Sequence, residues 1–276
     1  MILMKVQNRK LGELKRYIRE KGKNGVVVAF SGGVDSSTLA AVCHSVLGEK
    51  AVAVTAESPT YTPEELTETK KLAKEIGIRL YIIHTDELSN ELFCANPENR
   101  CYYCKQELLK RMKEVANQLG FETVFEGTNF SDLEDHRPGF KAVQEMKSVL
   151  SPWVDNEFTK EEIRALAGKI GLSVQNKPAL ACLASRIPYN ERITVMKLKR
   201  IARAERTIRR LTGIRQIRVR DHNGLARIEV GKDERKLLTS VEMMNKIVAG
   251  LKRLGFKYIT IDLEGYRTGS LLHALE

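Results

Sequence analysis

The sequence lacks long hydrophobic segments and contains few aromatic residues. Of its 276 residues, 6% are aromatic and one is tryptophan. No apolar run approaches the roughly eighteen residues that a membrane-spanning helix needs. Residues 1–10 pass from a short apolar start to basic residues, the reverse of a secretory signal peptide. We therefore expect a cytoplasmic protein without a membrane partner.

Acidic residues are scarce in the C-terminal part of the chain. Residues 191–276 hold 20 Lys and Arg against 10 Asp and Glu, whereas residues 1–190 hold 26 against 25. This asymmetry predicts two domains, 1–190 and 191–276, with the second facing an anionic partner. The alternative is a solvated surface rich in Lys, Arg and Glu. The basic part lacks the interleaved aromatic residues that stack on bases, but RNA remains one candidate partner.

Strand and helix patterns alternate before residue 190, which predicts an α/β fold with a doubly wound, mostly parallel sheet. Ligands of such sheets bind beyond the carboxyl ends of the strands. After residue 190 the pattern predicts a second, smaller α+β domain. The expected strands are 26–30, 51–55, 79–84, 123–128, 214–220, 226–230 and 257–262, and the expected helices are 36–47, 62–76, 104–119, 159–170, 194–211 and 234–254.

The segment Ser31–Ser37, SGGVDSS, joins the first strand to the first helix of this pattern. Its glycines allow close backbone approach to a ligand, and its hydroxyls and helix N-terminus suit a phosphate. It lacks the Lys-Ser/Thr ending of the Walker loop and the GxGxxG spacing of dinucleotide folds. It resembles the signature of the pyrophosphatase-loop (PP-loop) ATP enzymes.

The PP-loop resemblance implies a HUP-like fold and cleavage of ATP between the α and β phosphates. Asp35 would hold Mg²⁺ near the pyrophosphate. The loop alone fits NAD synthetase, GMP synthetase, argininosuccinate synthetase and tRNA thiolation enzymes equally. The predicted ATP-binding residues are Ser31, Gly32, Gly33, Val34, Asp35, Ser36 and Ser37 of the loop, with Thr55, Ala56, Thr128 and Asn129 at the ends of neighbouring strands.

Five cysteines in a cytosolic chain argue against a disulfide framework. Cys101 and Cys104 form a C-x-x-C pair, which fits a redox pair, half of a zinc site or two packed thiols. No obvious fourth zinc ligand follows, whereas three thiolates, with Cys182, suffice for a 4Fe–4S cluster with one open iron. Cys43 is expected to be a buried small hydrophobe, and Cys94 is ambiguous.

The motifs SGGVDSS, NRCYYCK, EGTN, RPGFKA and PALACLASRIPY together resemble the ATP-dependent sacrificial sulfur transferases, over essentially the whole chain. The resemblance implies that the acceptor is a pyridinium biscarboxylate mononucleotide, an intermediate of the nickel-pincer nucleotide cofactor. Cys182 matches the family's sulfur-bearing, catalytic cysteine. Members with this cysteine alone give up its sulfur and keep dehydroalanine. Members that also carry the C-x-x-C hold a 4Fe–4S cluster that sulfide or a sulfur-donor protein recharges, and Cys101 and Cys104 favour this form.

Arginines are the candidates for binding the substrate. Arg137 and Arg186 are placed to neutralise phosphate, and four hairpin residues share one face if the register permits: Arg218, Arg220, Arg227 and Glu229. The resemblance suggests that this face holds the substrate's phosphate, or a metal through Glu229, and that the protein forms a homo-oligomer. A solvated strand face is the alternative.

These motifs predict a two-stage reaction. ATP converts a carboxylate to an acyl adenylate, and a sulfur nucleophile then releases AMP and leaves a thiocarboxylate. The alternatives are a tRNA thiolation enzyme, an ammonia-using amidating synthetase, and a non-catalytic ATP-sensing module that docks on nucleic acid.

Overall fold

The computed structural model describes residues 2–133, 138–178 and 181–267, and the chain divides into two compact units. The first unit consists of Met1–Ser58, Pro63–Glu87 and Asn99–Leu180. The second consists of Pro59–Thr62, Leu88–Glu98 and Ala181–Glu276. The functions predicted for residues 1–190 and 191–276 stay predictions.

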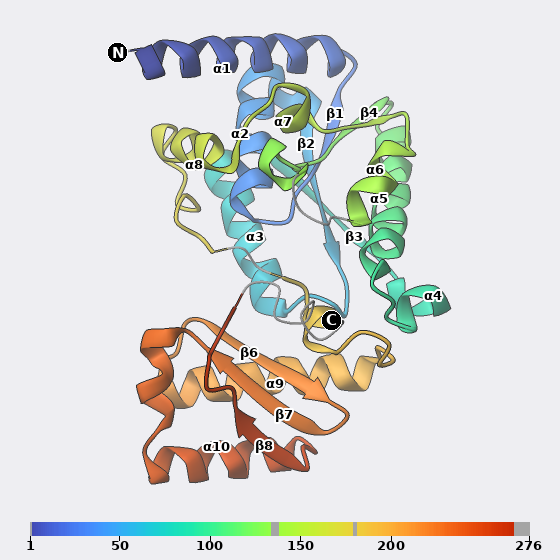
Figure 1. Cartoon of the computed structure of the whole chain (residues 1–276). Helices are drawn as coiled ribbons and strands as arrows, with labels where there is room; N and C mark the ends of the chain where they lie inside the picture. The colour runs from blue at the N-terminus through green and yellow to red at the C-terminus, as the bar shows by residue number, and fades with distance from the viewer. Residues whose placement is uncertain (1, 134–137, 179–180, 268–276) are drawn as a thin grey trace. The chain divides into compact units, whose positions relative to one another are not determined.

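The first unit contains a five-stranded sheet in the order β3-β2-β1-β4-β5, with every neighbouring pair parallel (Figure 1). This all-parallel sheet with helices on both faces confirms the predicted α/β fold. The strands are β1 (Val26–Ala29), β2 (Ala51–Glu57), β3 (Arg79–His84), β4 (Thr123–Phe125) and β5 (Val149–Leu150). The helices of eight or more residues are α1 (Ile2–Lys21), α2 (Val34–Leu47), α3 (Pro63–Ile76), α5 (Arg100–Gln118) and α8 (Lys160–Lys169). The shorter ones are η1 (Gly48–Lys50), η2 (Glu87–Ser89), α4 (Glu91–Cys94), η3 (Phe130–Leu133), α6 (Pro138–Gln144) and α7 (Pro152–Asp155).

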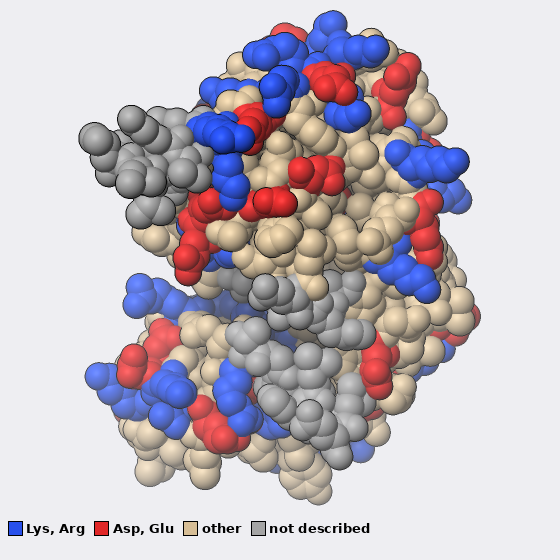
Figure 2. All heavy atoms as spheres, turned by 45° about the horizontal axis from the view of Figure 1, so that its top comes forward, with Lys and Arg blue, Asp and Glu red and all other residues tan. Residues whose placement is uncertain are grey.

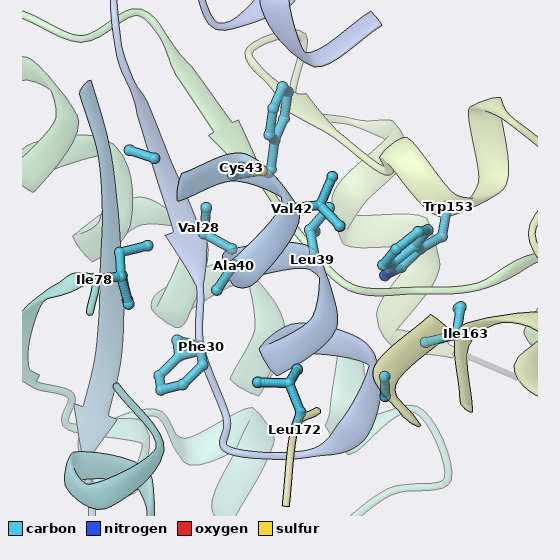
Figure 3. Close-up of a cluster of buried hydrophobic side chains, with 14 of the residues drawn as sticks. Val28, Phe30, Leu39, Ala40, Val42, Cys43, Ile78, Trp153, Ile163 and Leu172 are labelled. Carbon is cyan, nitrogen blue, oxygen red and sulfur yellow. The ribbon is translucent and has the colours of Figure 1, made fainter. Parts of the chain in front are cut away.

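Successive residues of β1 enter two different hydrophobic cores, because side chains alternate across a strand. Val26 and Val28 pack in a cluster with α1, α2, α3 and α8, whereas Val27 packs in a second cluster with α5 and α6. Figure 3 shows Val28 beside Ala40 of α2 in the first cluster. Burial on both faces explains why β1 is a continuous apolar run rather than an alternating one.

Helix α2 is the central helix of the first core. Eight of its positions from Val34 to Cys43 are buried, which explains its apolar sequence. Cys43 is fully buried, as expected, and its burial raises the pKa of the thiol above its usual range. Because α2 begins directly after Gly33, the rigid core fixes the position of the loop that precedes it.

The second unit contains a three-stranded sheet in the order β6-β7-β8, with β6–β7 antiparallel and β7–β8 parallel. Asn223 and Gly224 close the hairpin with φ of 50° and 98°, which suits a two-residue turn. This mixed sheet with two packed helices confirms the predicted smaller α+β unit. Its elements are η4 (Leu183–Arg186), α9 (Val195–Thr212), β6 (Ile217–His222), β7 (Leu225–Val230), η5 (Lys232–Leu238), α10 (Val241–Arg253) and β8 (Tyr258–Ile261).

The helix expected over residues 234–254 is divided. A 3₁₀ helix, η5, ends at Leu238, and α10 begins after Ser240. The Ser240 hydroxyl accepts a hydrogen bond from the Met243 amide at 3.2 Å, so this serine starts a new helix instead of lying within one.

Basic and acidic side chains are interspersed over much of the face drawn in Figure 2. Within the described ranges, no helix combines the length and the apolar character needed to cross a bilayer.

Candidate functional site

The SGGVDSS loop lies at the carboxyl end of β1, where a parallel sheet binds its ligands. Gly32 has φ of 69°, and a Cβ there would lie 2.5 Å from the Thr69 Oγ1 atom. The Ser36 hydroxyl lies 3.2 Å from the Ser31 amide and 3.0 Å from the Ser31 Oγ atom. The loop is therefore a tight turn that only glycine at position 32 allows.

The loop also contains a polar atom without a partner. Ser37 is fully buried in the first turn of α2, and within the described structure its hydroxyl makes no hydrogen bond. A buried hydroxyl without a partner costs stability. A helix N-terminus also attracts negative charge, so the loop fits a phosphate ligand.

Side chains distant in sequence converge on Asp35 of this loop. Its carboxylate accepts hydrogen bonds from Lys160 Nζ and, at 3.3 Å, from Asn129 Nδ2. Its carbonyl accepts one from Trp153 Nε1 at 3.1 Å. Lys177 Nζ donates to the Gly32 carbonyl at 3.0 Å. Two ammonium groups and a carboxylate that suits Mg²⁺ thus lie at one loop.

The position of Lys160 depends on the start of α8. Thr159 and Glu162 form a capping box, with the Glu162 amide 3.3 Å from Thr159 Oγ1 and the Thr159 amide 2.9 Å from Glu162 Oε2. Lys10 of α1 donates to both Glu162 oxygens at 2.9 Å and to the Glu157 carbonyl at 2.9 Å. Helix α1 therefore holds the turn that presents Lys160 to Asp35.

The EGTN motif places the end of β4 beside the loop. Glu126 is buried and accepts hydrogen bonds from Lys105 Nζ at 2.9 Å, from Thr128 Oγ1 at 2.8 Å, and from the Ser151 hydroxyl. Burial raises the pKa of Glu126, but Lys105 and these hydrogen bonds outweigh it and hold that pKa below its ordinary value. A Cβ at Gly127 would lie 3.2 Å from the Ser36 amide, so a glycine is needed for this approach.

Thr55 and Ala56 lie on the opposite side of β1, near the end of β2. Thr55 is buried and Ala56 is half-buried. Strand β1 contacts both β2 and β4, so all predicted ATP-binding residues lie along one sheet edge. Their contacts with ATP stay predictions.

The C-x-x-C pair occupies the first turns of α5, and residues three apart lie on one helix face. Cys101 is exposed, whereas Cys104 is half-buried with its Sγ atom 3.8 Å from Glu87 Oε1. Glu87 is buried and also accepts hydrogen bonds from the hydroxyls of Ser58 at 2.9 Å and Thr85 at 3.0 Å. The pair therefore lies near the ends of β2 and β3.

Cys182 is the N-cap residue of η4, in the second unit. Its carbonyl accepts hydrogen bonds from the Ser185 hydroxyl at 2.7 Å and from Arg186 Nη1 at 3.0 Å. Arg186 is buried and donates to Glu205 Oε1 at 3.0 Å. The half-buried thiol of Cys182 is thus carried on a backbone turn that a buried ion pair anchors.

Comparison with known proteins identifies relatives of this chain. The sequence model of the NAD synthase family matches residues 6–117. A pyridinium-3,5-bisthiocarboxylic acid mononucleotide synthase of Lactiplantibacillus plantarum is 35% identical over 249 residues, 89% of this chain and 88% of that protein. An uncharacterized protein of Synechocystis sp. is 42% identical over 266 residues, 96% of this chain and 98% of that protein. An uncharacterized protein of Methanocaldococcus jannaschii is 30% identical over 261 residues, 94% of this chain and 98% of that protein.

The chain belongs to the ATP-dependent sacrificial sulfur transferase family. It is therefore an ATP-dependent sulfur-transferring enzyme with a PP-loop domain. Within the described residues of this sulfur transferase, no three His, Cys, Asp or Glu side chains form a group suited to a metal ion. Cys101 and Cys104 belong to the first unit and Cys182 to the second, so the three-thiolate ligand set stays a prediction.

The predicted substrate face of the sulfur transferase is formed by the β6–β7 hairpin. The register pairs Arg218 with Glu229 and Arg220 with Arg227, so these four side chains share one face. Arg220 donates to both Glu229 oxygens, at 2.9 and 2.7 Å, and Arg227 donates to one at 3.0 Å. Arg218 and Arg220 are each 5% exposed, which differs from a solvated strand face.

Arg218 has the most unusual surroundings on this face. Burial is the main cause that lowers the pKa of its guanidinium, and the positive charge of Arg186 lowers it further. Its Nη1 donates to the Ile217 carbonyl at 2.8 Å, and its guanidinium lies 5.2 Å from the centre of the Tyr266 ring. The face therefore carries excess positive charge away from water. Arg137, the remaining predicted substrate residue, lies outside the described residues.

Sequence reasoning missed Lys160, Lys177 and Glu87. A signal existed for Lys160, because it is the first residue of a helix whose capping box, Thr159 to Glu162, is readable from the sequence. Lys177 and Glu87 lie outside any recognisable motif, and only the fold brings them to the loop and to Cys104.

Proposed function

We propose that this sulfur transferase adenylates a carboxylate of pyridinium-3,5-biscarboxylate mononucleotide and converts it to a thiocarboxylate, in synthesis of the nickel-pincer nucleotide cofactor. The observation that carries the proposal is the 35% identity to the bisthiocarboxylic acid mononucleotide synthase over 89% of the chain. A carboxylate is a poor electrophile, so sulfur transfer to it requires the ATP chemistry of a PP-loop.

In the first stage, ATP binds with its phosphates at the Ser31–Ser37 loop. Lys160 and Lys177 supply positive charge, and Asp35 is the carboxylate that would hold Mg²⁺. A substrate carboxylate oxygen attacks the α phosphorus, the bond to the β-phosphate oxygen breaks, and pyrophosphate leaves. The preorganised ammonium groups stabilise the charge that develops on the phosphates.

In the second stage, sulfur attacks the carbonyl carbon of the acyl adenylate. The carbon–oxygen bond to AMP breaks, and a thiocarboxylate remains. We propose that Cys101, Cys104 and Cys182 are the residues that would hold a 4Fe–4S cluster, and such a cluster would supply the sulfide for this step. The two thiols on one turn of α5 and the anchored turn of Cys182 support this donor set. Without a cluster, the Cys182 thiolate would attack the carbonyl carbon and form a thioester as AMP leaves. Loss of the Cys182 α proton would then break the Cβ–Sγ bond, release the thiocarboxylate and leave dehydroalanine.

We propose that the hairpin face binds the phosphate of the substrate. Arg218 is a buried guanidinium whose pKa is lowered by burial and by Arg186, so an anion beside it would relieve both effects. Arg220 and Arg227 share the carboxylate of Glu229, which leaves three guanidinium groups against one carboxylate on this face.

Anaerobic purification followed by iron and sulfide analysis tests the cluster, and incubation with ATP, sulfide and the biscarboxylate nucleotide tests the reaction. We expect about four irons per chain, AMP and pyrophosphate release, and a product gaining sulfur for oxygen. Cys101→Ala should abolish iron binding, whereas Cys43→Ala, which removes a thiol buried in the core, should retain it. Persistence of iron in Cys101→Ala contradicts the ligand set.

Two other acceptors are tested in the same assay. The basic excess after residue 190 favours tRNA as an alternative acceptor. If the assay yields thiolated nucleosides and no thiocarboxylate, the sulfur acceptor is RNA and not the biscarboxylate nucleotide. The NAD synthase match at residues 6–117 covers the ATP-binding part and favours amidation as an alternative. An iron-free preparation that amidates a carboxylate with ammonia would support that reaction instead.

A further inference from the structure

The outward side of α9 is entirely basic at its centre. Lys199, Arg203, Arg206 and Arg210, called the basic face below, are all exposed. Their spacing of four, three and four residues places them in one line along the helix, over about 16 Å. The opposite side of α9 packs in the core of the second unit through Ala204 and Ile208.

The acidic side chain of α9 pairs with two arginines outside the basic face rather than with Lys199, Arg203 or Arg210. Glu205, the one acidic residue of α9, is buried and pairs with Arg186 at 3.0 Å and Arg209 at 3.5 Å. Within the described part of the chain, Lys199, Arg203 and Arg210 pair with no carboxylate. Like charges three and four residues apart destabilise a helix, so the sequence keeps an arrangement that works against the helix's own stability.

Two further carboxylates of the second unit are buried and pair with other arginines. Asp221 and Glu229 are fully buried and are used by Arg200 at 2.6 Å and by Arg220 at 2.7 Å. Residues 191–276 hold 20 basic against 10 acidic residues, and the basic ones other than Arg218 and Arg220 are exposed or half-buried. The basic face is a regular line of exposed basic residues, and none of its four residues is among the predicted site residues.

The kind of partner follows from Met196, which is 77% exposed and lies three residues before Lys199. It extends the line of the basic face with a flexible apolar side chain, a residue type enriched in protein interfaces. A phosphate backbone offers no apolar surface for it, and α9 contains no aromatic residue for base stacking. A second helix has the same rise per residue, so its carboxylates at three- and four-residue spacing match the basic face.

We propose that the basic face of α9 docks an acidic protein helix, with Met196 contacting an apolar residue of that partner. The partner presents Asp or Glu in one line over three turns. Charge complementarity of this kind speeds encounter and fixes register more than it adds affinity. The proposal concerns partner recognition and does not depend on the identity of the sulfur acceptor.

The probe is a fluorescent helical peptide with Glu at positions i, i+4, i+7 and i+11 and Leu in line with them. A peptide of equal composition, with its Glu residues distributed around the helix, is the matched control. We expect fluorescence anisotropy with the full-length enzyme to show at least tenfold tighter binding of the patterned peptide. Raising the salt concentration should weaken this binding.

Variant enzymes locate the contact. Arg203→Glu with Arg206→Glu should weaken patterned-peptide binding at least tenfold and leave sulfur transfer unchanged. Lys252→Glu with Arg253→Glu makes the same charge change on exposed positions of α10 and should leave binding within twofold. Circular dichroism checks that both variants fold. Met196→Ala should weaken binding about threefold.

Three outcomes overturn the proposal. Equal binding of the two peptides shows general charge attraction, and equal losses in the α9 and α10 variants place the contact elsewhere. Tighter binding of a 20-base-pair RNA duplex, lost in the α9 variant, assigns the basic face to nucleic acid instead.

Discussion

The Cys182 turn is held by its backbone rather than by its thiol. Ser185 and Arg186 donate to the Cys182 carbonyl, and neither hydrogen bond needs the sulfur atom. Cys182→Ala should therefore keep the turn, abolish sulfur transfer and leave adenylation within about threefold of the wild type. Pyrophosphate release and thiocarboxylate formation, measured separately, check this. Retained sulfur transfer with lost adenylation would falsify the proposed division of labour.

Lys160 donates a hydrogen bond to the Asp35 carboxylate in the loop. If it neutralises the phosphates of bound ATP, Lys160→Met should raise the KM for ATP about tenfold or more, equivalent to roughly 1.4 kcal/mol. Lys169→Met, an exposed position in the last turn of the same helix, is the control and should leave that KM unchanged. Similar KM values for both variants contradict this role of Lys160.

Glu126 is held ionised by Lys105 and by hydroxyl groups, although it is buried. Glu126→Gln should lower the free energy of unfolding by about 2–3 kcal/mol at pH 7, because Lys105 loses its partner while staying partly solvated. A carboxyl group whose pKa is lower in the folded state stabilises the fold at pH values above its unfolded-state pKa, near 4.3. This stabilisation is lost as the pH falls through the folded-state pKa. Urea unfolding at pH 7 and at pH 4 should show a smaller difference at the lower pH.

At the residue scale, the loop was readable because its glycines and serines form a contiguous motif with one physical purpose. Lys160 and Lys177 were not, because they lie 125 and 145 residues away from the groups they contact. Lysine is common on surfaces, so its type alone carries no signal. The capping box marks Lys160 as the start of a helix, but only the fold shows that Lys160 and Lys177 reach the loop.

At the scale of elements, helix α1 is linked to the SGGVDSS loop through the side chain of Lys10. Lys10 holds the Glu162 carboxylate, which completes the capping box next to Lys160. Lys10→Met should therefore lower the free energy of unfolding by about 1–2 kcal/mol and raise the KM for ATP several-fold. Arg9→Met removes a neighbouring charge that pairs with Glu13 on the surface of α1. That variant should leave stability within about 0.5 kcal/mol and KM unchanged, and equal effects of the two variants contradict the connection.

The strands and capped helices followed from local chemistry. The capping box at Thr159 and the turn at Asn223-Gly224 are strong local signals, and both occur as expected. Helix α1 was not expected, because its buried residues Leu14 and Ile18 lie among many charged ones. The division of 234–254 into η5 and α10 was missed, since a continuous apolar pattern hides the cap at Ser240.

For the whole molecule, alternating strands and helices predicted the parallel sheet, because few other architectures bury both faces of such strands. The sequence did not indicate which segments of the chain form the second unit. Residues 59–62 and 88–98 join it through contacts far along the chain, such as the Asn96 side chain with the Pro188 carbonyl at 2.6 Å and the Glu191 carbonyl at 3.0 Å.

Asn96 is fully buried and makes these contacts within the second unit. Asn96→Ala leaves several buried carbonyls without a donor, which should cost about 2–4 kcal/mol. Hydrogen exchange should accelerate in residues 88–98 and 181–193 but not in β1 to β5. Asn245→Ala on the exposed side of α10 is the control. Uniform acceleration throughout both units contradicts this separation.

The repeated passage of the chain between its two units has a consequence for synthesis. Residues 59–62 and 88–98 leave the ribosome before the rest of their unit, which is not complete until residues 181–276 have been translated. In the nascent chain, these two segments must therefore wait without their packing partners from the second unit. A gene fusion that transplants residues 191–276 alone would therefore lack part of the second unit.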